Sequence, residues 1–150
     1  DPKNASAYFD LGNARIMQGE LALALKSFEK ATALKPKFWE ALNNQALVLF
    51  EMKRRDEAIR RWRRVLTLEN NAEPMLALAA ALHQQGKEEE ALSLARSALA
   101  KNPNYVLPLH QEAHVWGKQI RQATAELLSI NELASSVERA QANATWKKRQ

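Results

Sequence analysis

The chain of 150 residues is 46% apolar, carries a formal net charge of +5 and contains no cysteine, which excludes disulfide bonds and thiolate metal sites. Only four glycines and five prolines interrupt a sequence rich in good helix formers, and no apolar run approaches the roughly 20 residues that cross a bilayer. We therefore expect one helical domain over residues 1–150, with too little net charge to indicate a polyanion partner.

Residues 5–38 predict two helices joined by a short turn. Apolar residues recur at helical spacing on both sides of Gly19, which suits the end of the first helix, and Pro36 stops the second. The small residue Gly12 stands where the two helix axes are expected to approach within roughly 8–10 Å. Phe28 is expected to fill the space between this helix pair and the next.

The same pattern returns in residues 39–71 and 72–105. The matching positions are Ala24, Phe28, Ala31 and Pro36, then Ala58, Trp62, Val65 and Asn70, then Ala91, Ala95, Ala98 and Pro103. The second segment has Lys53 where the first has a glycine, which requires either a left-handed non-glycine residue or a different turn. A repeat of about 34 residues without strand-like alternation predicts helix-turn-helix units that bury their apolar faces by stacking.

Residues 106–145 predict a degenerate fourth helix pair and a capping helix. Pro108 suits the first turn of a helix and Gly117 its end, and Asn131 is a plausible N-cap for a further helix. An apolar stripe consists of Ile120, Ala123, Leu127, Ile130, Leu133 and Val137. We expect this stripe to cover the open end of the array in a monomer, the alternative being a homodimer. The polar tail 146–150 is expected to fray.

One family resemblance rests on a spaced motif in the first repeat. The motif residues are Tyr8, Leu11, Gly12, Ala24, Phe28, Ala31 and Pro36. This motif resembles the tetratricopeptide repeat, although Arg15 and Gln45 depart from the family pattern. The resemblance covers residues 5–105 and implies a right-handed all-α solenoid that binds proteins. With the segment beyond residue 105, we expect seven to nine helices in all. No nucleophile elbow, phosphate loop or paired catalytic carboxylates indicate an enzyme, and no cofactor is expected.

The resemblance also implies a binding site, because the first helix of each pair lines a concave groove in this family. The residues carried over are Phe9, Asn13, Ile16 and Met17, then Asn43, Asn44, Leu47 and Phe50, then Leu76 and His83. Exposed aromatic and methionine side chains form the kind of apolar patch that marks an interaction site. We expect a peptide or helix of a partner protein to bind there, within a larger scaffold or assembly factor. The alternative is that another part of the array, or a second copy, covers the patch.

One subgroup of the family binds the acidic C-terminus of a chaperone through two asparagines and three cations. The asparagines are present as Asn13 and Asn44, whereas Phe9, Glu73 and Ala77 replace the cations. Charge-assisted bonds to a carboxylate are then lost, and Glu73 would repel the ligand. The sequence therefore argues against a chaperone tail as partner. The two amides are expected either to bind a ligand backbone or to be solvated.

An arginine-rich segment, residues 53–64, raises nucleic-acid binding as an alternative function. The candidate basic patch comprises Arg60, Arg61 and Arg64. Asp56 and Glu57 each stand four residues before an arginine, the favourable order for ion pairs on one helix. Trp62 falls on the core position that Phe28 occupies in the first repeat. A solvated, partly self-paired convex surface is therefore favoured over a polyanion site.

His110 and His114 are spaced as metal ligands on a helix can be, but no cysteine or convergent carboxylate completes a site, so no metal is expected. The compartment is undetermined. The sequence begins at Asp1 without an initiator Met and reads as an excerpt, so a targeting or anchor segment can lie outside it. The cytoplasm is the default expectation.

Overall fold

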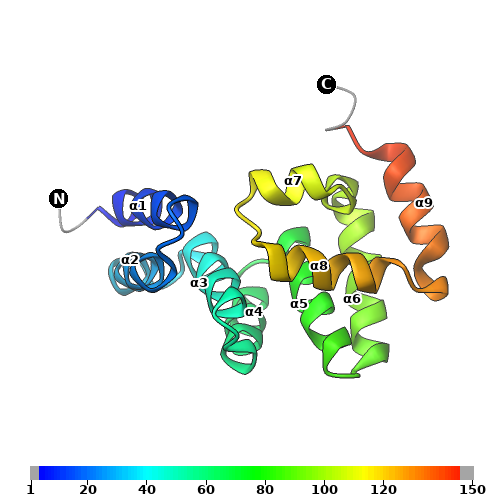
Figure 1. Cartoon of the computed structure of the whole chain (residues 1–150), viewed down its shortest axis with the longest axis horizontal. Coiled ribbons are helices and arrows are strands. Elements are labelled where there is room, and N and C mark those ends of the chain that lie inside the picture. Colours follow the sequence, from blue (N-terminus) through cyan, green and yellow to red (C-terminus); the bar gives the residue numbers. More distant parts are fainter. Residues whose placement is uncertain (1–3, 146–150) are drawn as a thin grey trace. The chain divides into compact units, whose positions relative to one another are not determined.

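The computed structural model describes residues 4–145, which form helices and turns and contain no β-strand (Figure 1). Three helix pairs follow one another: α1 (Ala5–Met17) and α2 (Leu21–Leu34), α3 (Trp39–Glu51) and α4 (Arg55–Leu68), and α5 (Ala72–Gln84) and α6 (Glu88–Lys101). Each pair lies within one of the predicted repeats. The predicted all-α fold of helix-turn-helix repeats is therefore confirmed. None of the described helices combines the length and apolarity of a membrane span.

The chain divides into two compact units, residues 1–69 and 70–150. The first unit contains α1 to α4. The second contains α5 and α6, then the 3-10 helix η1 (Pro103–Val106), α7 (Pro108–Ala113), α8 (Lys118–Leu128), the 3-10 helix η2 (Asn131–Leu133) and α9 (Ala134–Asn143). Nine α-helices thus lie within the described residues, at the upper end of the predicted number.

The helices of each repeat are joined by the same left-handed turn. Gly19, Lys53 and Gly86 occupy equivalent positions with φ values of 78°, 64° and 79°. The next residue closes each turn; for example, the Arg54 N–H donates to the Leu49 carbonyl over 2.9 Å. Lys53 therefore adopts the left-handed conformation, which is one of the two geometries predicted for it.

This shared turn predicts opposite effects of two exchanges. Lys53→Gly should raise the free energy of unfolding by about 1 kcal/mol, because it relieves the steric cost of a left-handed L-residue. Gly86→Lys should lower it by a similar amount, since an added Cβ at Gly86 meets no atom within 4 Å and only the backbone conformation is affected. Urea denaturation of both variants measures the two changes. Two changes of the same sign would contradict this explanation.

The core of the first unit contains the predicted small and aromatic residues. Gly12 is buried, and Phe28 and Trp62, at equivalent positions of their repeats, are fully buried. A Cβ added to Gly12 would lie 2.5 Å from Cε1 of Phe28, so the glycine permits the ring to pack directly against α1. The predicted role of small residues between the helices is thus confirmed at this position.

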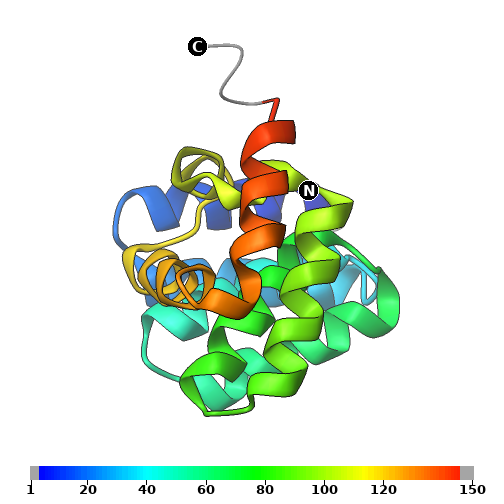
Figure 2. The same ribbon diagram turned by 90° about the vertical axis from the view of Figure 1, so that its right-hand side faces the viewer.

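The C-terminal helices of the second unit cover the α5–α6 pair. α8 packs against α5, and α9 packs against η1 and α6, as the two views show (Figures 1 and 2). Four residues of the predicted stripe, Ile120, Ala123, Leu127 and Leu133, are buried in this packing. The expected degenerate pair and capping helix are therefore present. The predicted fraying of residues 146–150 lies outside the described residues.

Two predicted boundaries in this segment are wrong. α7 ends at Ala113, and the left-handed position of its turn is Val115, with a φ of 60°; Gly117 instead precedes α8 as its N-cap. Asn131 begins η2 and gives no side-chain cap to α9. Gly117 was the predicted end of α7 because glycine adopts positive φ without strain. In the structure, the β-branched residue Val115 adopts the positive φ instead.

Candidate functional site

Helix α1 holds the predicted groove residues that remain accessible in the first unit. Phe9, Asn13 and Ile16 are half-buried, and Met17 is 82% exposed. These four positions recur at helical spacing and share one side of the helix. The Phe9 ring packs against the Phe38 ring, with a centroid distance of 5.1 Å, so its position is supported from the core. We call these four residues the α1 surface.

Other predicted groove residues are buried. They are Asn43, Asn44, Leu47 and Phe50 of α3 and Leu76 of α5. The reason in α3 is its composition: residues 47–50 are consecutively apolar, so they point to every side of a helix with about 3.6 residues per turn. The predicted exposure of these side chains is therefore wrong. In the second unit His83 is half-buried, and its Nδ1 lies 2.6 Å from a carboxylate oxygen of Glu88.

A chain of side-chain hydrogen bonds runs through the first unit to Asn13. The Trp62 indole N–H donates to Asn43 Oδ1 over 3.0 Å, and the Asn43 amide donates to Asn44 Oδ1 over 3.3 Å. The Asn44 amide in turn donates to Asn13 Oδ1 over 2.8 Å. Asn44 is thus buried and bonded within the protein, which argues against solvation, one of the two alternatives expected for it. The Asn13 oxygen is held in place, which leaves its Nδ2 group as the donor at the accessible end.

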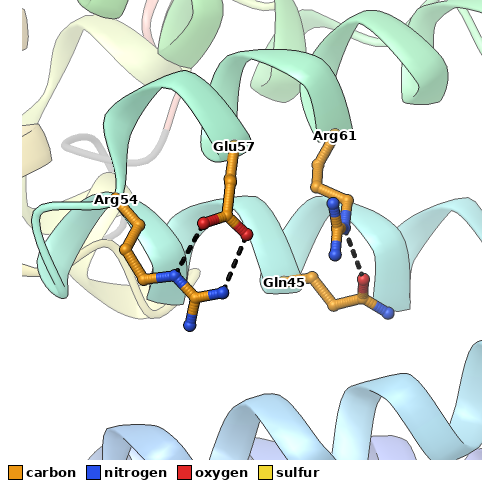
Figure 3. A network of polar contacts seen from close by, with 4 residues as sticks. All are labelled: Gln45, Arg54, Glu57 and Arg61. Atoms are coloured by element: carbon orange, nitrogen blue, oxygen red, sulfur yellow. Dashed lines mark hydrogen bonds and ion pairs between the residues drawn. The ribbon is translucent and has the colours of Figure 1, made fainter.

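The arginine-rich helix α4 is tied to its neighbours through a buried glutamine. Gln45 Nε2 donates to the Phe28 carbonyl and to Thr32 Oγ1, at 3.1 and 2.9 Å. Its Oε1 accepts a 3.0 Å hydrogen bond from Arg61 Nε (Figure 3). Gln45, which stands where the family pattern has an apolar residue, therefore joins α2, α3 and α4. Arg61 is engaged in this structural contact.

One ion pair of α4 differs from the predicted one. Glu57 binds Arg54 through two hydrogen bonds of 2.8 and 2.9 Å, rather than pairing with Arg61 (Figure 3). This hydrogen bonding lowers the pKa of Glu57. Arg60 and Arg64 are exposed, whereas Arg61 is half-buried. The candidate basic patch thus retains two exposed arginines.

The second unit contains a buried cluster around Glu73. Its carboxylate accepts a 2.9 Å hydrogen bond from the Trp116 indole N–H and a 3.3 Å hydrogen bond from the Tyr105 hydroxyl. Burial, together with the negative charge of Glu73, raises the pKa of Tyr105. Glu73 therefore anchors the fourth helix pair to α5. No sequence signal identified this contact, since its partners lie 32 and 43 residues away along the chain.

The two histidines of the fourth pair belong to the same cluster. The rings of His110 and His114 are 4.4 Å apart, and His110 also lies 4.4 Å from the ring of Tyr105. No group of three or more potential metal ligands occurs among residues 4–145. Burial, with a smaller contribution from the charge of His114, lowers the pKa of His110 to about 4.

The lowered pKa of His110 predicts a loss of stability in mild acid. Between its ordinary value of 6.5 and the folded value of about 4, the unfolded chain binds a proton that the folded chain does not. The free energy of unfolding should therefore decrease as the pH falls through this window. His110→Gln should flatten the dependence of Tm on pH, which thermal denaturation across this pH window measures. An unchanged slope in His110→Gln would refute this assignment.

Comparisons with known proteins agree with the geometry of the repeats. Two family models, both described as Tetratricopeptide repeat, match residues 5–38 and 43–106. The crystal structure of MamA is similar in fold, with a TM-score of 0.67 and 19% sequence identity, and the match covers 93% of this chain and 81% of the MamA chain. No curated protein shows significant sequence similarity to this chain. The chain belongs to the tetratricopeptide-repeat family.

Proposed function

We propose that this chain is a non-catalytic interaction module that binds a peptide or helix of a partner protein on the α1 surface. Tetratricopeptide repeats generally mediate protein–protein interaction. The observation that carries the proposal is the juxtaposition of a positioned amide donor, Asn13 Nδ2, with the exposed Met17 and the half-buried Phe9 and Ile16 on the same side of α1. The module would form one segment of a larger scaffold or assembly factor.

The two parts of the α1 surface supply different kinds of binding energy. Met17 offers flexible apolar contact area, and the partly exposed faces of Phe9 and Ile16 extend it. Asn13 Nδ2 is suited to donate to a main-chain carbonyl of the ligand. Because the chain of bonds to Trp62 holds the Asn13 oxygen, this donor is oriented before the ligand binds, which lowers the entropic cost of binding.

The experiment is capture of partners from the source lysate, with the bound proteins identified by mass spectrometry. Ile16→Ser combined with Met17→Ser should reduce capture at least tenfold, because the apolar contact is removed. Asn13→Asp should also weaken capture, since it keeps an acceptor for Asn44 but replaces the donor with a carboxylate oxygen.

The matched control is Leu23→Ser, which removes an apolar side chain of α2 that is 41% exposed. It should leave capture unchanged. Circular dichroism should show wild-type helicity for all variants. Equal capture by wild type and the Ile16 and Met17 double variant would refute the α1 surface as the binding site.

A polyanion-binding function through α4 remains the alternative. Only Arg60 and Arg64 of the patch are exposed, and Arg61 is bonded to Gln45, which weakens this alternative. Phosphate contacts release counterions, so such binding would weaken steeply as salt is raised. Arg60→Glu combined with Arg64→Glu should abolish it without affecting the α1 surface.

A further inference from the structure

A second surface feature lies in the second unit, between α6 and α9, which run side by side in both views (Figures 1 and 2). A cavity of about 190 Å³ opens there. Its apolar floor includes Leu99 and Ala140, which are 3% and 2% exposed. Arg96 of α6 and Arg139 of α9 line the cavity from the two helices, and Ser136 adds a hydroxyl group. The cavity therefore exists because the capping helix packs against the third repeat.

The two arginines give this cavity a positive charge. Arg96 Nη2 donates to the Glu132 carbonyl over 3.1 Å, which fixes the guanidinium while using one of its five N–H groups. Within residues 4–145, neither Arg96 nor Arg139 forms an ion pair with a carboxylate. Both side chains are exposed, so their remaining donors are accessible from solvent.

We propose that this cavity binds an acidic peptide segment of a partner protein. One carboxylate would lie between Arg96 and Arg139, and an adjacent apolar side chain would contact Leu99 and Ala140. Guanidinium groups bind carboxylates through paired, charge-assisted hydrogen bonds, which matches the two donors found here. The formal net charge of +5 favours approach of an acidic segment over a basic one.

The size and lining of the cavity favour a peptide side chain over other ligands. Its volume of about 190 Å³ is below the roughly 300–1,000 Å³ of typical small-molecule sites. Its lining contains no aromatic residue on which a nucleic-acid base could stack. The proposal concerns a different surface from α1, so the two can fail independently.

The test is an NMR titration of the full chain, following backbone amides and arginine Nε–H groups. The probe is the capped peptide Glu-Glu-Leu-Glu-Glu, and the comparison peptide is Gln-Gln-Leu-Gln-Gln. The acidic probe should shift the resonances of Arg96, Arg139 and Ala140 and should bind at least tenfold more tightly than the neutral peptide.

Matched variants separate a specific site from attraction to net charge. Arg96→Gln combined with Arg139→Gln should weaken binding of the acidic probe at least tenfold. Arg60→Gln combined with Arg64→Gln removes the same charge from α4 and should change binding less than twofold. Because Arg139 donates no side-chain hydrogen bond to the described residues, Arg139→Gln alone should fold normally and still weaken binding.

Three results would overturn the proposal. The first is an equal loss in the α4 control pair, which would show attraction to net charge alone. The second is equal binding of the neutral peptide, which would show that the carboxylates are not recognised. The third is tighter binding of an octathymidylate to the same residues, which would assign the cavity to nucleic acid.

Discussion

Trp116→Ala is expected to lower the free energy of unfolding by about 3–5 kcal/mol, the range found when large buried aromatic residues are truncated. Trp116 is 2% exposed, and its ring stacks on Tyr105 with a centroid distance of 5.9 Å. Truncation leaves a cavity beside α5 and removes the 2.9 Å indole donor from the buried Glu73 carboxylate. Urea denaturation followed by far-UV circular dichroism measures the loss without relying on tryptophan fluorescence.

Trp116→Phe separates the two contributions. Phenylalanine keeps most of the ring contact but has no N–H, so its cost should reflect mainly the lost hydrogen bond to a buried charged group, about 1–3 kcal/mol. Glu73→Gln, combined with Trp116→Phe, should then cost less than the sum of the two single changes, because both remove the same interaction. Additive costs would show that the Glu73 contact does not stabilise the fourth helix pair.

The helices and their pairing could be predicted because their signals are local. Periodic apolar residues, turn residues and prolines act within a few positions, and the three helix pairs lie where these signals recur. The predicted helix end at Gly117 was wrong, although the preference of glycine for the left-handed conformation is also a local signal. At the end of α7 the chain turns at Val115 before it reaches Gly117, although a glycine adopts the left-handed conformation with less strain.

The candidate site was less predictable, since its geometry depends on long-range contacts. The family resemblance gave Asn13 and Met17, which are at least partly accessible, but also Leu47 and Phe50, which are buried. The polar partners were also missed: Asn13 meets Asn44 across 31 positions of the sequence. Sequence spacing predicts hydrogen-bonded and ion pairs only between residues of one helix. In the folded protein, donors and acceptors from distant segments also lie close enough to bond.

Gly12→Ala is expected to lower the free energy of unfolding by about 2 kcal/mol, although alanine is the better helix former by about 1 kcal/mol. An added Cβ would lie 2.5, 2.7 and 2.8 Å from three carbon atoms of the Phe28 ring, closer than real Cβ contacts allow. The ring is fully buried, so it cannot move into solvent, and α1 must shift away from α2. Thermal and urea denaturation of the variant measure the change.

The sign of this effect is what tests the packing argument. If helix propensity dominated, Gly12→Ala would stabilise the protein, and that result would contradict the close contact with Phe28. Ala14→Gly, at an exposed position of the same helix, isolates the propensity contribution and should cost about 1 kcal/mol. Because a smaller side chain at position 28 makes room for the added methyl group, Gly12→Ala should be less costly in a Phe28→Leu background. The double variant should therefore be more stable than the sum of the two single changes predicts, as expected for residues in direct contact.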